Sequence, residues 1–116
     1  MRPYVIQVTS AIAFILAIFQ LYLGLNMESF GIGGLHLHIT VALILLGLFH
    51  IPFLRGEGLH KKVYLGLIIL TGLQGLLGLY MAFIQHILFI KNIHHGFGWL
   101  ILFGSLVGLI SILLKK

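Results

Sequence analysis

Four apolar stretches, each close to the length that crosses a membrane, fill most of this chain of 116 residues. They cover residues 4–26, 35–54, 62–84 and 93–114. Because about 20 apolar residues span a bilayer, four crossings with short connections use the whole chain. Polar or glycine-rich segments separate the stretches at 28–34, 55–58 and 85–92. The sequence predicts an all-α membrane protein, a bundle of four transmembrane helices forming one domain over residues 1–116.

The scarcity of charge supports the same conclusion. The chain has seven Lys or Arg and two Asp or Glu residues, which together are 8% of its length, and 60% of it is hydrophobic. Soluble domains use about a quarter of their residues for charge. The composition therefore excludes an ordinary soluble protein, a disordered chain and a nucleic-acid binder, despite a formal net charge of +5. Membrane lipid is the expected surrounding.

Two local signals bear on the helix ends. Pro3 suits the first turn of a helix, and Pro52 is expected to kink or stop the second helix near its end.

The first apolar stretch is too long for a signal peptide and contains the polar residues Gln7, Ser10 and Gln20. We interpret it as a retained membrane helix.

The basic residues predict the orientation. The end of the bundle that carries both termini and the loop between the second and third helices holds six Lys or Arg residues, and the opposite end holds Lys91 alone. Basic residues gather on the cytoplasmic side of membrane proteins. A multi-pass protein of the plasma membrane is expected, with both termini in the cytoplasm and the loops that contain Glu28 and Lys91 outside.

Two short patterns recur along the chain. Residues 20–27 and 74–81 share Gln-x-x-Leu-Gly-Leu-x-Met, 54 residues apart, and residues 38–47 and 95–104 share His-x4-Leu-Ile-Leu-x-Gly, 57 residues apart. The matches predict two similar helical hairpins, 4–54 and 62–114. Both hairpins enter the membrane the same way up, around a pseudo-twofold axis along the membrane normal.

The second pattern places His38 and His95 at equivalent heights on the second and fourth helices, about 3 to 6 Å inside the hydrocarbon edge. In a four-helix bundle such residues can face each other across the interior. The chain has no cysteine, which excludes thiolate metal sites. Two facing imidazoles suit a planar haem, with one nitrogen on each side of the iron. The structural alternative is that these histidines lie at the headgroup level without a ligand.

Further residues are predicted to surround the cofactor. Gly24 and Gly78 lie at about the height of the histidines, where a missing side chain lets backbone approach the porphyrin edge. Gln20 and Gln74 lie about a turn deeper. Buried amides usually form hydrogen bonds across helices, and the functional alternative is support of an imidazole or contact with the haem periphery.

His36 and His94 point about 200° and 100° away from the proposed ligands around their helices, so they are not expected to face inward. They are candidates to reach the haem propionates together with Lys91 or Asn92, and a surface position is the alternative. His50 lies near the inner end of the second helix, His60 in the inner loop and His86 in the outer loop. Since the fourth helix has no histidine at the inner level, one haem per chain is expected.

These residues resemble a known family. Gln20 with Gly24, His38 followed by Ala42, the Leu-x-Gly-Leu-Leu-Gly-Leu run at 73–79 and His95 together are similar to one half of heme A synthase. That family consists of two four-helix halves, each with a histidine pair on its second and fourth helices, and it oxidises the methyl group of haem O to the formyl group of haem A. Shortened relatives with a single half belong to it. The resemblance implies that His38 and His95 are haem ligands.

The chain also departs from that family. The catalytic half of heme A synthase has a glutamate three residues before the histidine of its second helix and an arginine after it, where this chain has Leu35 and Ile39. The cysteine pair that many members carry is absent. Glu28 is the one acidic residue on the outer side. The chain therefore resembles the cofactor-holding half more than the oxidising half.

Four hypotheses follow. The first is a b-type cytochrome with one bis-histidine haem near the outer face, which transfers electrons alone or as a subunit of a respiratory oxidase or cytochrome complex, with quinone as a possible partner. The second is a compact heme A synthase, a homo-oligomer that oxidises haem O to haem A, so that haem O or A is the bound haem. The third is a non-haem metal site made of His36, His38, His94 and His95, and the fourth is a structural subunit. The sequence leaves open whether the chain is an enzyme.

Overall fold

The protein is all-helical, as predicted. A computed structural model describes residues 3–114, which form α1 (Pro3–Leu25), α2 (Met27–Arg55), α3 (Gly58–Phe83) and α4 (Leu88–Leu113). Each helix is long and apolar enough to cross a membrane. The chain is therefore a multi-pass membrane protein built as a four-helix bundle.

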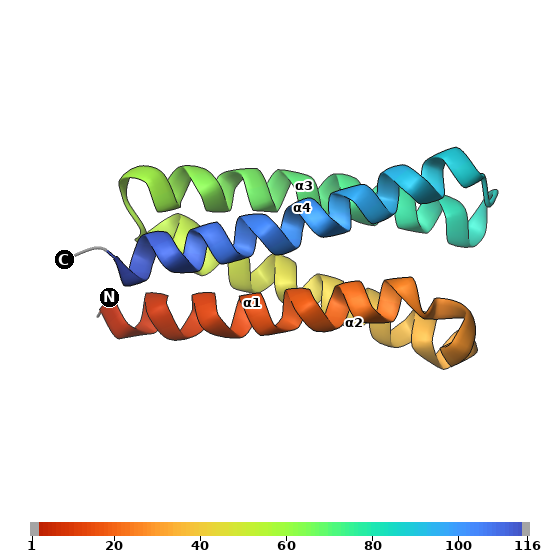
Figure 1. Cartoon of the computed structure of the whole chain (residues 1–116), viewed down its shortest axis with the longest axis horizontal. Coiled ribbons are helices and arrows are strands. Elements are labelled where there is room, and N and C mark those ends of the chain that lie inside the picture. Colours follow the sequence, from red (N-terminus) through yellow and green to blue (C-terminus); the bar gives the residue numbers. More distant parts are fainter. Residues whose placement is uncertain (1–2, 115–116) are drawn as a thin grey trace.

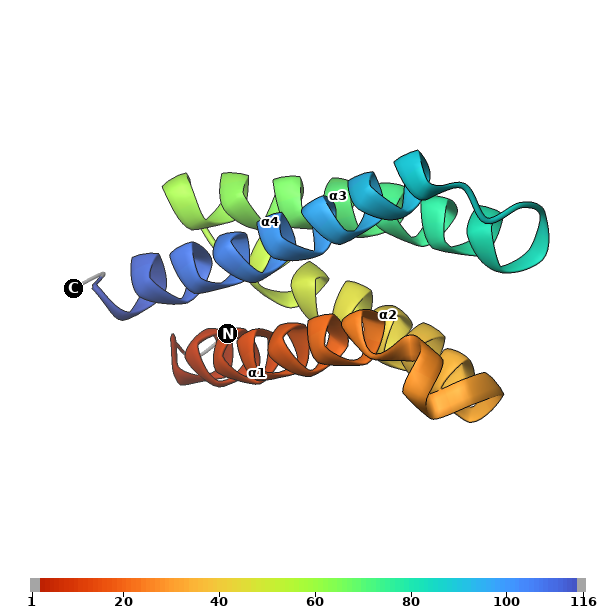
Figure 2. The same ribbon diagram turned by 45° about the vertical axis from the view of Figure 1, so that its right-hand side comes forward.

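The four helices lie side by side along the long axis of the molecule (Figures 1 and 2). Helix α1 packs against α2 and α4, and α3 packs against the same two helices, whereas within residues 3–114 the backbones of the pairs α1/α3 and α2/α4 do not approach closely. The start of α1, the end of α4 and the α2–α3 connection lie at one end of the bundle, which we call the proximal end, and the connections α1–α2 and α3–α4 lie at the distal end. The bundle is 46 Å long, close to the roughly 40–45 Å thickness of a bilayer with its headgroups.

The second and fourth helices begin earlier than the sequence predicts. Residues 28–34 were expected to form a loop, but they are helical on both sides of Gly31, where the backbone is non-helical with φ 65° and ψ −151°. Glycine adopts this left-handed conformation without a steric cost. Helix α4 begins at Leu88 instead of residue 93. Longer helices satisfy more backbone hydrogen bonds internally, which matters where lipid replaces water.

Pro52 lies in the last turn of α2, where the sequence predicted a kink or a stop. The helix continues three residues further, to Arg55, and ends with the Gly56 N–H donating to the Pro52 carbonyl oxygen at 2.8 Å. Pro52 itself is buried. The predicted end of the second helix is therefore correct within a few residues.

The proximal half of the bundle has a filled core. The rings of Phe49 and Tyr64 pack with their centroids 5.9 Å apart, and Tyr64 is fully buried. A Cβ atom on Gly108 would lie 2.8 Å from the Tyr64 hydroxyl oxygen, so glycine is needed for α4 to approach this ring. The same cluster includes Ala13, Ala17, Leu45, Leu67, Ile101 and Ile112.

Buried positions recur between the two hairpins. On α1 and α3 they repeat at a spacing of 54 residues, which matches the first sequence pattern; these pairs are Ser10 with Tyr64, Ala13 with Leu67, and Ala17 with Thr71. On α2 and α4 they repeat at 56 residues; these pairs are Leu45 with Ile101, Phe49 with Ser105, and Pro52 with Gly108. The equivalence of α2 and α4 thus differs by one residue from the spacing of 57 in the second sequence pattern.

Lipid-facing residues explain this one-residue difference. The second pattern depends on a Leu-Ile-Leu run, and Leu43, Ile44 and Leu100 of that run are at least half exposed on the outer surface of the bundle. Lipid accepts any apolar side chain, so identities there do not fix which face of the helix points inward. A shift by one residue turns an α-helix by about 100° and changes which histidine faces the interior.

Candidate functional site: a cavity in the distal half of the bundle

A cavity of about 880 Å³ lies between the distal halves of all four helices. The four helices contribute equivalent faces to it. On α1 and α3 the lining residues repeat at positions i, i+3 and i+7; they are Ala17, Gln20 and Gly24 of α1, and Thr71, Gln74 and Gly78 of α3. On α2 and α4 they repeat at i, i+3, i+7 and i+10; they are Leu35, His38, Ala42 and Leu45 of α2, and Lys91, His94, Gly98 and Ile101 of α4. The cavity volume is within the range of small-molecule and cofactor sites, about 300 to 1,000 Å³.

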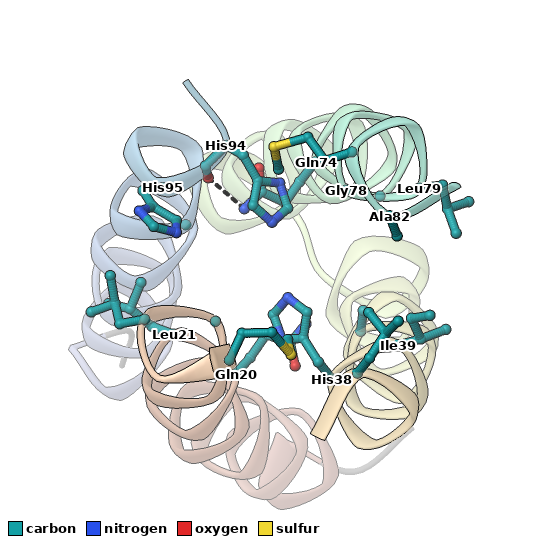
Figure 3. Close-up of a pocket in the computed structure, with 18 of the residues that line it drawn as sticks. Gln20, Leu21, His38, Ile39, Gln74, Gly78, Leu79, Ala82, His94 and His95 are labelled. Carbon is teal, nitrogen blue, oxygen red and sulfur yellow. Dashed lines mark hydrogen bonds between the residues drawn. The ribbon is translucent and has the colours of Figure 1, made fainter. Parts of the chain in front are cut away.

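His38 and His94 face each other across the middle of this cavity. Their ring centroids are 6.2 Å apart and their planes are inclined by 78°. Figure 3 shows the two rings pointing toward each other from α2 and α4, the diagonal pair of helices. His94 is 8% exposed.

The structure corrects the expectation that His95 faces His38. His95 also lines the cavity, but it is half-buried at the side of α4, and its ring centroid lies 6.2 Å from that of His94. The expectation that His94 points away from the interior is likewise wrong. Both errors have one cause, because the burial of α4 follows the 56-residue spacing and not the 57-residue match in the sequence.

Two glycines hold the facing histidines against neighbouring helices. A Cβ atom on Gly24 would lie 3.2 Å from Cε1 of His38, and one on Gly78 would lie 3.0 Å from Cε1 of His94. Both distances are shorter than ordinary van der Waals contact. Gly24 and Gly78 therefore allow each imidazole ring to pack closely on the adjacent helix of its own hairpin, a role that the sequence alone did not indicate.

The two glutamines differ in their contacts. Gln74 donates a hydrogen bond from Nε2 to the carbonyl oxygen of His94 at 2.6 Å, which joins α3 to α4 directly beside the facing histidine. This is the interhelical bond expected of a buried amide in a membrane bundle. Gln20 lines the equivalent part of α1, and its Oε1 is buried without a hydrogen-bond partner.

Several polar atoms around the cavity are buried and unpaired. Within residues 3–114, seven buried side-chain atoms have no hydrogen-bond partner, and five of them belong to residues that line the cavity. These five are Nδ1 of His38, Nδ1 of His94, Oε1 of Gln20, Oε1 of Gln74 and Oγ1 of Thr71. An unpaired buried polar group costs about 1 to 3 kcal/mol, so such a concentration suits a site that receives a ligand or ordered water.

The distal mouth of the cavity is polar. Glu28, His86 and Lys91 line it together with Asn26 and Ser29. Lys91, a candidate to reach the haem propionates, lines the cavity here. His86 is exposed to solvent or headgroups as well as lining the cavity.

Two candidate residues, His36 and Asn92, lie away from the cavity, and the two residues at the departures from heme A synthase line it. His36 is exposed, and its carbonyl oxygen accepts a hydrogen bond from Thr40; Asn92 is exposed too, and neither residue lines the cavity. Leu35 and Ile39 do line the cavity. The two positions where this chain departs from the catalytic half of heme A synthase therefore bring apolar side chains to the site.

The two proximal histidines have local partners. His50 is exposed, and its Nδ1 bonds with the carbonyl oxygen of Leu46 at 2.7 Å. His60 is buried, and its Nε2 accepts a hydrogen bond from the Glu57 N–H at 2.9 Å at the start of α3. Neither histidine lines the distal cavity.

Across the part of the chain that the structure describes, no group of three or more His, Cys, Asp or Glu side chains is placed to hold a metal ion. The four-histidine arrangement required by a non-haem centre is not formed, because His36 lies outside the cavity. The chemistry available at the site is that of two opposed imidazoles with a third, His95, beside them.

The chain matches no protein-family model, no curated protein and no solved structure. The geometry of the cavity is therefore the basis for assigning a function.

Proposed function

We propose that this chain is an integral membrane b-type haem protein in which His38 and His94 would hold one haem. The observation that carries the proposal is the 6.2 Å separation of their ring centroids in the middle of a cavity. His94 replaces His95, the second ligand that the sequence predicts. The resemblance to the cofactor-holding half of heme A synthase suggests the same cofactor, although it matches His95 and not His94.

A direct N–H···N hydrogen bond of about 2.9 Å would bring the ring centroids to about 5.1 Å, which is shorter than the 6.2 Å observed, so the two imidazoles do not bond to each other. Their ring nitrogens would be available to hold the iron of a haem.

The surrounding residues would hold the ligands in position. Gly24 and Gly78 let the two rings pack on the neighbouring helices, and the hydrogen bond from Gln74 fixes the backbone of His94. Lys91 places a positive charge at the cavity mouth, where it would attract the carboxylates of the cofactor. Bound haem supplies reversible one-electron chemistry, and two protein ligands leave no open coordination position. Electron transfer is therefore the favoured activity.

The charge distribution supports a location in the plasma membrane with the proximal end in the cytoplasm. Arg55, Lys61 and Lys62 lie at the proximal end, and Lys91 lies at the distal end. Three further basic residues, Arg2, Lys115 and Lys116, are outside the described residues. The haem would then lie near the outer face, where a respiratory oxidase or cytochrome subunit could exchange electrons with it.

The proposal is tested by an absorption spectrum of the detergent-solubilised full chain, oxidised and then reduced. We expect a Soret band, a sharp reduced α band of a six-coordinate haem, and one haem per chain. A pyridine haemochrome assay distinguishes haem b from haem O and A, and haem A formation on co-expression with haem O synthase would favour the heme A synthase alternative. A colourless protein after expression with sufficient haem would overturn the proposal.

A further inference from the structure

The distal cavity has two side walls, each formed where one hairpin meets the other. One wall is the seam between α1 and α4, and the other is the seam between α2 and α3. The repeat spacings make Leu21 of α1 equivalent to Gly75 of α3, and Gly98 of α4 equivalent to Ala42 of α2. The equivalent residues differ in side-chain size, so the two seams differ in how completely they are filled.

The α1/α4 seam is closed by a leucine side chain. Leu21 packs toward Gly98, where an added Cβ atom would lie 3.2 Å from Cδ1 of Leu21. Leu21, His95 and Gly98 line the cavity here, and all three are only partly exposed. The side chain of Leu21 thus fills the space between the two helices.

The α2/α3 seam is open. Gly75 lines the cavity, and a Cβ atom added to it would meet no atom within 4 Å. Leu43 and Leu79 line the same cavity while 65% and 45% of their surface is exposed on the outside of the bundle. We call this opening the α2–α3 window; it is formed by Ile39, Ala42, Leu43, Gly75, Leu79 and Ala82. Figure 3 shows Ile39 of α2 opposite Leu79 and Ala82 of α3 at this side.

A buried hydroxyl group lies just inside the window. Thr71 is four residues before Gly75, so the two share one face of α3. Thr71 lines the cavity, is 7% exposed, and its Oγ1 has no hydrogen-bond partner. This hydroxyl group can donate to an acceptor that enters from the window.

The window and the hydroxyl group together restrict the chemistry of a ligand. The window faces the hydrocarbon region and is apolar, so a charged headgroup would lose its hydration on entering. A plain hydrocarbon chain could enter, but it would leave the Thr71 hydroxyl unpaired. A flat neutral ring with carbonyl oxygens and a hydrocarbon tail meets both conditions.

We propose that the α2–α3 window admits the ring of a membrane-dissolved quinone, with a ring carbonyl accepting a hydrogen bond from Thr71 and the tail remaining in lipid between α2 and α3. The Thr71 level is seven residues deeper than Gly78, about 10 Å along the helix, so the quinone ring lies below the level of the facing histidines. Binding of the quinone is independent of haem, and its role as the electron partner rests on the proposed haem function.

The test is photolabelling of the full chain in lipid vesicles with a short-tailed benzoquinone that carries an aryl azide, followed by mapping of the label by mass spectrometry. We expect saturable labelling within residues 39–43 and 71–82 that excess unlabelled quinone removes. Gly75→Leu introduces at the α2/α3 seam the same side chain that Leu21 supplies at the α1/α4 seam. It should lower the labelling at least tenfold. Gly72→Leu is the matched control, because Gly72 is exposed on the same helix with nothing within 4 Å of an added Cβ atom.

A second variant tests the hydrogen bond. Thr71→Val keeps the shape and removes the hydroxyl group, and it should weaken quinone binding by about 2- to 10-fold, the value of one hydrogen bond, while Thr71→Ser restores it. The proposal is overturned if Gly75→Leu labels like the unmodified chain, or if labelling spreads evenly over all four helices and is not competed. A spectrum of each sample separates the two proposals: a colourless chain with saturable labelling retains the window and overturns the haem, and a haem-loaded chain without saturable labelling does the reverse.

Discussion

His38 and His94 lie on diagonal helices of the bundle and direct their imidazole rings toward each other, with ring centroids 6.2 Å apart. Neighbouring helices could not present two rings in this way, because side chains on adjacent helices meet at the seam and not in the middle of the bundle. The diagonal arrangement also leaves α1 and α3 free to bring Gly24 and Gly78 against the rings. The site therefore depends on all four helices.

This relationship predicts different effects for two adjacent histidines. His94→Ala removes one of the facing rings and should abolish at least nine-tenths of the Soret absorbance per chain. His95→Ala, one residue later and in the same cavity, should keep most of it. The measurement is the haem-to-protein ratio after purification, with His38→Ala as the positive control. Equal loss in His94→Ala and His95→Ala would show that the pair of ligands is assigned wrongly.

The glycine contacts predict a graded effect on haem retention. Gly24→Ala and Gly78→Ala each place a Cβ atom within about 3 Å of a histidine Cε1, so the ring must move by a few tenths of an ångström. A strain of about 1 kcal/mol would speed haem loss about fivefold. Haem transfer to excess apomyoglobin measures this rate.

Gly96→Ala is the control for the glycine variants, because Gly96 lies on α4 near the site and an added Cβ atom there meets nothing within 4 Å. It should lose haem at the unmodified rate. If all three glycine variants lose haem at the same rate, the close packing of the rings has no role in holding the cofactor.

Much of the fold follows from the sequence because lipid imposes it. Helix number and approximate helix positions were predicted correctly, and buried positions of α1 and α3 recur at the spacing of the first sequence pattern. The pattern shared by these two helices contains Gln20 and Gly24 with their counterparts Gln74 and Gly78, which line the cavity, so their identities report on the interior.

The register of α4 could not be predicted in the same way. The pattern that matched His95 with His38 includes Leu43, Ile44 and Leu100, which are exposed on the outside of the bundle, where Leu, Ile and Phe are interchangeable. His94 and His95 are adjacent, so the one that faces the interior is decided by which face of α4 is buried. That face depends on packing. Residues such as Ser105 and Gly108, which are small and buried, indicate the inner face of α4. The closed and open seams likewise depend on the contact of Leu21 with Gly98, which no local pattern reveals.

The hydrogen bond between Gln74 and the carbonyl oxygen of His94 predicts a stability difference between the two glutamines. Gln74→Leu removes the 2.6 Å bond that joins α3 to α4. The resulting loss should be about 0.6 to 1.7 kcal/mol, the range of interhelical hydrogen bonds in membranes. Gln20→Leu, at the equivalent position of α1, removes no side-chain hydrogen bond that the structure contains and should cost less. Unfolding by SDS, followed by circular dichroism, compares them, and an equal or larger loss in Gln20→Leu would contradict the prediction.

The contact between Gly108 and Tyr64 predicts a stability effect in the proximal core that leaves the distal site intact. Gly108→Ala places a Cβ atom 2.8 Å from the Tyr64 hydroxyl oxygen in a region without free space, so we expect a loss of about 1 to 3 kcal/mol in SDS unfolding. Tyr64→Phe removes a buried hydroxyl that has no hydrogen-bond partner, so alone it should be neutral or stabilising, and it should relieve part of the cost of Gly108→Ala in the double variant.

The control is Gly66→Ala, which is exposed on α3 with no neighbour near an added Cβ atom and should leave the stability unchanged. Neither Tyr64 nor Gly108 lines the distal cavity, so the haem-to-protein ratio of the folded variants should equal that of the unmodified chain. Additive effects of Gly108→Ala and Tyr64→Phe would show that α4 is not held at this distance from the tyrosine ring.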